Sequence, residues 1–73
     1  MAKISVLSSR IVIKTLIKDG YFIVRQKGSH IRLHHLRKKP VTVPNHSSIG
    51  KGLLKKILRD SELSLLDFKK LLE

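Results

Sequence analysis

Apolar residues recur with a helical period near the start of the chain. A helix is expected from Ser8 or Ser9 to Lys18, because its apolar positions have the spacing of a helix that faces a core. These positions are Val12, Ile13, Leu16 and Ile17. A serine can cap the start of this helix, and Gly20 stands where a left-handed residue commonly follows the end of one. For residues 1–7, a frayed end and an extra turn both remain open.

The next part of the chain has the pattern of a β-hairpin. Residues 21–25 are rich in strand formers, and residues 27–29 form a tight connection in which Gly28 can adopt a positive φ. Residues 30–34 then alternate, with Ile31 and Leu33 on one side of the strand. The pattern predicts a hairpin with one face on a helical core and one wet, basic face.

A third strand and two helices are expected after the hairpin. Pro40 opens a short strand, residues 41–43, at a position where it does not disturb the ladder. A second helix is expected from Gly50 or Lys51 to Asp60. Its core face is Leu54, Ile57 and Leu58, with Leu53 adjoining. A last helix starts at the capping residue Ser64. Its apolar side is Leu65, Leu66, Phe68, Leu71 and Leu72.

This order of elements predicts an α+β fold. A helix, a three-stranded antiparallel meander and a returning helix form a small two-layer sandwich, α-β-β-β-α, with an extra C-terminal helix. The double-stranded-RNA-binding fold has the same order. A chain of 73 residues is expected to form one domain, residues 1–73. It has no cysteine, and no apolar run approaches the roughly 20 residues of a membrane span, so we expect a cytoplasmic protein without a membrane partner.

Positive charge dominates the middle of the sequence. Sixteen Lys and Arg residues against five Asp and Glu give a formal net charge of +11. Between Gly20 and Arg59 the chain has basic residues and no acidic one. They are Arg25, Lys27, Arg32, Arg37, Lys38, Lys39, Lys51, Lys55, Lys56 and Arg59. Such a field favours a polyanion, because each neutralised phosphate releases counterions. A surface kept basic for solubility, or one that pairs with an acidic protein, is the alternative.

His30 is the candidate for chemistry. RNA supplies its own nucleophile, the 2′-hydroxyl, so a cleaving protein needs a proton acceptor, a proton donor and stabilisation of the phosphate. Histidine performs either proton transfer near neutral pH. His30 begins a predicted strand beside a glycine turn, on the face that carries Arg32 and His34. We interpret His30 as a general base or acid that needs no metal and no cofactor. Without further motifs, a polar strand residue on an exposed face is the better interpretation.

Several residues are predicted to contact RNA around His30. Gly28 lets the backbone approach a phosphate, Ser29 can donate a hydrogen bond to it, and lysines can stabilise the extra negative charge of the transition state. The predicted contacts are Lys27, Gly28, Ser29, Arg32, Lys51 and Lys55.

The remaining histidines are given structural interpretations. His34 and His35 are predicted to be surface or turn residues, and His46 a loop hydrogen-bonding residue or an RNA contact. Four histidines without cysteine or paired acids have no recognised spacing of a zinc site, so no metal is predicted. Residues 50–52 read Gly-Lys-Gly but lack the spacing and hydroxyl of a P-loop, so a helix start is the simpler interpretation.

Four short motifs together resemble those of the HicA toxins. They are Asp19-Gly20-Tyr21, Gly28-Ser29-His30, Val43-Pro44-Asn45-His46 and Gly50-Lys51-Gly52, within a resemblance that runs roughly from Ser9 to Phe68. The resemblance implies a small mRNA-cleaving ribonuclease with a double-stranded-RNA-binding-like fold. It also implies that His30 is catalytic, that a HicB antitoxin neutralises the protein, and that DNA is contacted only through the antitoxin. Many members have a second histidine directly after the motif, where this chain has Ile31. Alternation places Ile31 on the face opposite His30.

Three function classes follow from the sequence. The first is a histidine ribonuclease toxin. The second is a non-catalytic RNA-binding module, which would share the fold and charge but have no use for a Gly-Ser-His hairpin. The third is a DNA-binding protein whose last two helices imitate a helix-turn-helix, against which the preceding strands and the scarcity of base-reading side chains argue.

Overall fold

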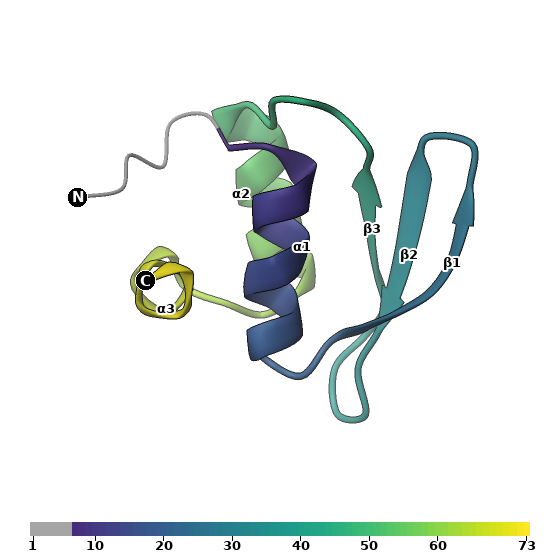
Figure 1. The fold of residues 1–73 in the computed structure, drawn as a ribbon. Helices are drawn as coiled ribbons and strands as arrows, with labels where there is room; N and C mark the ends of the chain where they lie inside the picture. Colours follow the sequence, from purple (N-terminus) through teal and green to yellow (C-terminus); the bar gives the residue numbers. More distant parts are fainter. Residues whose placement is uncertain (1–6) are drawn as a thin grey trace.

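The structure is a computed structural model that describes residues 7–73. The elements are, in chain order, α1 (Ser9–Lys18), β1 (Phe22–Lys27), β2 (His30–His34), β3 (Val41–Pro44), α2 (Lys51–Asp60) and α3 (Leu65–Leu72). The strands form one antiparallel sheet in the order β1-β2-β3, and the helices lie on one side of it (Figure 1). The predicted α+β class, the helix–meander–helix order and the extra C-terminal helix are therefore confirmed.

The helices begin and end where the sequence indicates. The Ser8 hydroxyl accepts a hydrogen bond from the backbone N–H of Ile11, and the Ser64 hydroxyl accepts one from that of Asp67. Gly20 has a φ of +110°, as expected for a residue that ends α1. By contrast, the start of α2 has Gly50 at the N-cap and no side-chain hydrogen bond.

One hydrophobic cluster lies between the helices and the sheet. It consists of Leu7, Val12, Ile13, Leu16, Tyr21, Ile31, Leu33, Val41, Val43, Ile49, Leu54, Ile57, Leu58 and Phe68. Leu7 and Ile49 pair as an isolated antiparallel bridge, which the sequence did not indicate. Of residues 1–7, for which two predictions were open, only Leu7 lies within the described part of the chain.

One residue that periodicity placed on the core-facing stripe of the first helix is exposed, so that assignment was wrong. Ile17 is 47% exposed because it lies about 100° around α1 from Leu16, at the margin of the buried stripe. Leu65 and Leu66 are also exposed. The two-turn helix α3 reaches the core through Phe68, which is fully buried, and the partly buried Leu72 packs against the same cluster.

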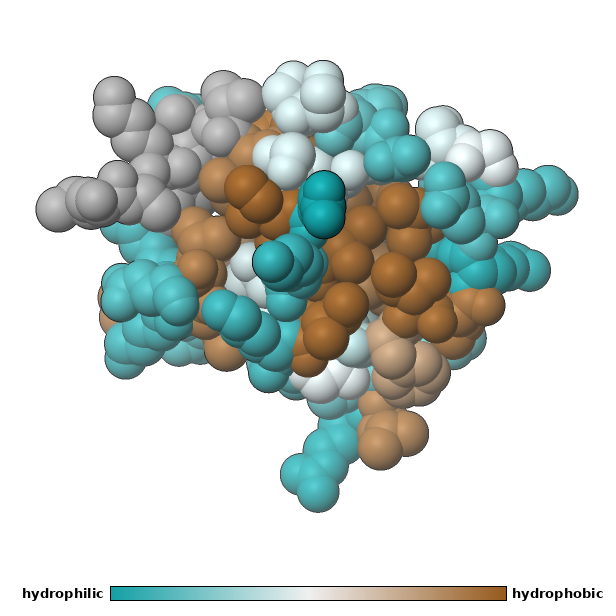
Figure 2. Space-filling model, in the orientation of Figure 1, coloured by the Kyte–Doolittle hydropathy of each residue, from teal (hydrophilic) through white to brown (hydrophobic). Residues whose placement is uncertain are grey.

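Strand β1 contributes no buried side chain, although one face of the hairpin was expected to lie on the core. The expectation holds for β2, where Ile31 and Leu33 are buried. On β1, Phe22, Ile23 and Val24 are all more than 40% exposed. Figure 2 shows hydrophobic side chains over the strands on this face of the molecule, with hydrophilic side chains projecting from the outer edge of the sheet. The edge strand thus extends beyond the cover that the helices provide.

The connection between β2 and β3 is tied to the end of α1. His35 accepts a hydrogen bond at Nδ1 from the backbone N–H of Arg37, so its Nε2 carries the proton and donates to the Asp19 carbonyl at 2.9 Å. The Lys38 ammonium lies 2.7 Å from the Asp19 carboxylate. The Tyr21 hydroxyl donates to the Lys39 carbonyl at 3.0 Å. Burial, together with the negative charges of Asp19, Glu62 and Asp60, raises the pKa of Tyr21 to about 12.

Candidate functional site

The solvent-facing side of the sheet contains a shallow cationic hollow of about 440 Å³. It is lined by Arg25, Lys27, His30, Arg32 and Thr42, which come from all three strands. The strand pairing explains why these side chains meet. His30 lies opposite Lys27, and Arg32 lies opposite both Arg25 and Thr42, and directly opposed residues point to the same face of a sheet.

A β-bulge at Val24 puts the cations of β1 on this face. Ile23 pairs with Leu33 on the core side, but the register then shifts so that Arg25, and not Val24, lies opposite Arg32. A shift of one residue reverses the face on which every later side chain lies. If Val24 paired with Arg32 in a regular ladder, Arg25 would lie opposite Ile31, on the side of the helices. The bulge is therefore what brings Arg25 and Lys27 to His30.

His30 is exposed at the mouth of the hairpin turn. Gly28 has a φ of +59°, and a Cβ placed on it would have no neighbour within 4 Å. The backbone beside His30 is thus open to solvent, and the approach of a phosphate to it stays a prediction. The Gln26 amide donates a hydrogen bond to the Gly28 carbonyl at 3.2 Å, which stabilises the turn.

The segment after β3 braces the same turn. The backbone N–H of Asn45 donates to the Ser29 carbonyl, and the Asn45 side-chain oxygen accepts a hydrogen bond from the Ser9 hydroxyl at 3.2 Å. The carbonyl of His46 accepts a hydrogen bond from the backbone N–H of Ser9 at 3.0 Å. The Pro-Asn-His segment therefore links the turn before His30 to the start of α1. The imidazole of His46 is exposed, and its predicted contact with RNA stays a prediction.

The hollow has a strongly positive lining. Arg25, Lys27 and Arg32 carry full charges, and no acidic side chain lines it. The Arg32 guanidinium donates to the Thr42 hydroxyl at 2.8 Å, which fixes its position across the sheet. Fixed cations next to an exposed imidazole can bind a phosphodiester and stabilise additional negative charge on it.

The structure divides the predicted RNA contacts between two surfaces. Lys27, Gly28, Ser29 and Arg32 lie in or beside the hollow that contains His30. Lys51 and Lys55 instead line a separate groove on α2. The contact of each set with RNA stays a prediction.

Two residues of the hollow were not predicted as site residues. Arg25 and Thr42 carry no motif of their own. Thr42 could have been found from its alternation with Val41 and Val43, which places it on the face of Arg32. Arg25 could not, because its face depends on the bulge.

Among residues 7–73, no group of three side chains that could hold a metal ion occurs. In the same part of the chain, no helix has the length and apolar character needed to span a membrane.

These features define a small α+β domain with a cationic sheet face built around one exposed histidine. Residues 9–63 match the family model described as "HicA toxin of bacterial toxin-antitoxin". The chain therefore belongs to the HicA family and is a toxin of a toxin–antitoxin system, a class that acts together with an antitoxin partner. A comparison with curated proteins gave no significant match.

Proposed function

We propose that this toxin is an endoribonuclease that cleaves mRNA with His30. The observation that supports the proposal most directly is the exposed imidazole beside three cations in the hollow of the sheet. The HicA family match supports it independently, since it covers the hairpin and all three strands. A cytoplasmic location, where mRNA is translated, fits this activity.

The reaction needs no external nucleophile. The 2′-oxygen of a ribose attacks the adjacent phosphorus, the bond from phosphorus to the 5′-oxygen breaks, and a cyclic phosphate and a free 5′-hydroxyl result. One group takes the proton of the 2′-hydroxyl, and another gives a proton to the leaving 5′-oxygen. We assign one of these transfers to His30 and leave the second to water or a neighbouring lysine. Because the substrate supplies the nucleophile, no metal-bound hydroxide is required.

The cations around His30 would stabilise the pentacoordinate transition state. Its phosphoryl oxygens carry more negative charge than those of the substrate, so the fixed charges of Arg25, Lys27 and Arg32 would bind it more tightly. The open backbone at Gly28 and the hydroxyl of Ser29 would position the phosphate beside the imidazole. The predicted RNA contacts of Lys51 and Lys55 lie outside this hollow and stay a separate prediction.

We further propose that the antitoxin is a HicB protein that covers this hollow. The cationic lining and the exposed hairpin offer an inhibitor a surface that also blocks RNA. In this proposal DNA is contacted only through the antitoxin, since nothing in the toxin suggests a reader of bases.

Cleavage of a long single-stranded transcript by the full chain tests the proposal. We expect His30→Ala to lower the cleavage rate by at least about 100-fold, the usual contribution of a positioned proton-transfer group, with little change in RNA affinity. His34→Ala is the matched control, because His34 is also exposed on β2 but does not line the hollow. Circular dichroism checks that both variants fold.

The possible outcomes separate the two candidate functions. Equal cleavage by the wild-type protein and a folded His30→Ala variant would remove His30 from the mechanism. Binding of RNA without any cleavage would favour the non-catalytic RNA-binding module. Loss of cleavage on addition of a chelator would show that a metal is needed.

A further inference from the structure

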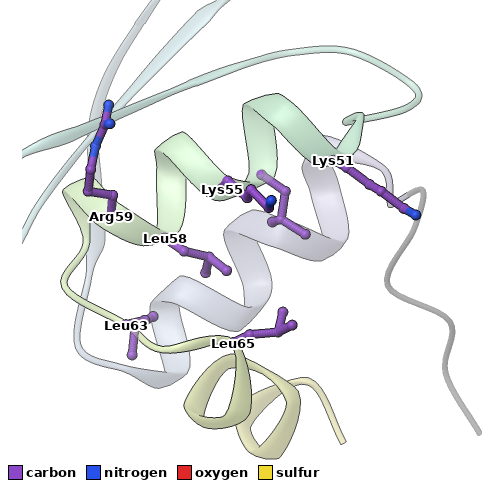
Figure 3. A pocket seen from close by; sticks show the side chains of 7 residues that line it. Lys51, Lys55, Leu58, Arg59, Leu63 and Leu65 are labelled. Carbon is purple, nitrogen blue, oxygen red and sulfur yellow. The ribbon is translucent and has the colours of Figure 1, made fainter.

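A second surface of the molecule has a different character from the hollow. A groove of about 620 Å³ runs along α2 and the start of α3. It is lined by Lys51, Leu54, Lys55, Leu58, Arg59, Leu63 and Leu65. Figure 3 shows the three cationic side chains spaced along α2, with leucines from α2, from the following turn and from α3 beside them. The groove is thus an aliphatic surface bordered on one side by positive charge.

The positive border is a regular row. Lys51, Lys55 and Arg59 recur every four residues on one face of α2, so they span about 12 Å along the helix axis. Neither lysine forms an ion pair among residues 7–73, and Arg59 only approaches the neighbouring Asp60, at 3.9 Å. The row is available to an external anion.

The apolar part of the groove is open to solvent. Leu63 is half-buried, and Leu65, the first residue of α3, is 52% exposed. Leu54 and Leu58 form the buried floor. An exposed aliphatic strip of this kind on a small, highly charged domain marks a surface for a partner.

We propose that this groove binds an acidic amphipathic helix of a partner protein. Aliphatic side chains at the i, i+4 and i+7 positions of such a helix would contact the leucines, and Asp or Glu residues along its flank would pair with the row on α2. The proposal stands independently of the ribonuclease activity.

Two other occupants fit less well. RNA is recognised by aromatic stacking and polar contacts to bases, whereas the lining of this groove, among residues 7–73, consists of leucines and three cations. A second copy of the chain would bring a formal charge of +11 against a positive row and would be repelled.

The test uses fluorescence anisotropy with a labelled helical peptide. The peptide has leucines along one face, glutamates on both flanks and alanines elsewhere, and a scrambled peptide of the same composition serves as its control. We expect the full chain to bind the amphipathic peptide at least about tenfold more tightly than the scrambled one at physiological salt.

Two pairs of variants locate the site. Lys55→Glu and Leu65→Asp should each weaken binding by about tenfold, because one reverses the charge of the row and the other removes an apolar wall. Lys56→Glu and Leu66→Asp are their matched controls. They make the same changes on the same helices at exposed positions that do not line the groove, and should change the affinity by less than about twofold.

The same variants are titrated with a labelled single-stranded RNA. The proposal is overturned if both peptides bind equally, since the attraction is then only one of net charge, or if control and groove variants lose affinity alike. It is also overturned if Lys55→Glu weakens RNA binding more than Lys56→Glu while leaving the peptide affinity unchanged. That result would make the row an RNA contact, as the sequence analysis predicted.

Discussion

Two glycines of this chain, Gly20 and Gly28, have a positive φ. Replacing each with alanine should lower the free energy of unfolding by different amounts, because only at Gly20 would the added Cβ meet a neighbouring side chain. Gly28, in the hairpin turn, has a φ of +59°, close to the left-handed helical region, and a Cβ there would meet nothing within 4 Å. The expected cost of Gly28→Ala is therefore the conformational one alone, about 1 kcal/mol in the free energy of unfolding.

Gly20 should be much more sensitive. Its φ is +110°, outside the left-handed helical region, and a Cβ would lie 2.8 Å from Nε2 of His35. That nitrogen donates to the carbonyl of Asp19, so the ring cannot move without loss of a hydrogen bond, worth about 1 kcal/mol. Adding the backbone strain, of about 2 kcal/mol, we expect Gly20→Ala to cost about 3 kcal/mol or more.

Urea and thermal unfolding, followed by circular dichroism, measure both values. A domain of this size has roughly 4–11 kcal/mol of stability in total. Gly20→Ala should lower the melting temperature by about 12 °C or more, and Gly28→Ala by about 4–8 °C. Both glycine variants are made in a His30→Ala background, which under the proposed function permits expression of the toxin. If Gly20→Ala is no more destabilising than Gly28→Ala, the packing of His35 against Gly20 is not as tight as the structure indicates.

Three further predictions concern stability and RNA binding. Because the pKa of Tyr21 rises from 10.0 to about 12 on folding, the stability that this shift contributes is fully present below pH 10 and is lost as the pH rises toward 12, by up to about 3 kcal/mol. Tyr21→Phe should flatten this part of the stability curve, and the absorbance of the only tyrosine follows its ionisation directly; ionisation near pH 10 in the folded protein would contradict the assignment. Phe68→Ala should lower the free energy of unfolding by about 3–5 kcal/mol and unfold much of the protein, although Phe68 lies beyond the residues matched by the family model. A near-native melting curve for this variant would show that the fold does not need α3. The slope of log RNA affinity against log salt concentration reports the number of counterions released, and Arg32→Ala should lower that number by about one. An unchanged slope would show that RNA does not bind at Arg32.

Local sequence patterns predicted the helices and strands well, because interactions between residues close in sequence determine where these elements begin and end. The caps at Ser8 and Ser64, the turn at Gly28 and the alternation of residues 30–34 each depend on a few neighbouring residues. Ile31 and Leu33 are buried as the alternation indicated, and His30 is exposed.

Features that depend on distant partners were not predicted. Ile49 lies in a segment without periodicity and is buried only because the chain brings it beside Leu7. The exposure of Ile23 depends on how far the helices cover the sheet, which the pattern of a single strand does not contain. For the same reason, Arg25 was missed as a site residue, and Lys51 and Lys55 were grouped with a hollow that they do not line.

The bulge at Val24 has a consequence for how this protein can vary. All six residues of β1 are exposed, so a new side chain on this strand would contact few neighbours. Most substitutions there should therefore change the stability of the fold little. Gain of one residue beside Val24 is different, because a single-residue bulge would then leave Val24 opposite Arg32 and Arg25 opposite Ile31, on the side of the helices. Loss of Val24 would only remove the bulge and leave Arg25 opposite Arg32. In this strand, an insertion should therefore disturb the sheet more than most substitutions do.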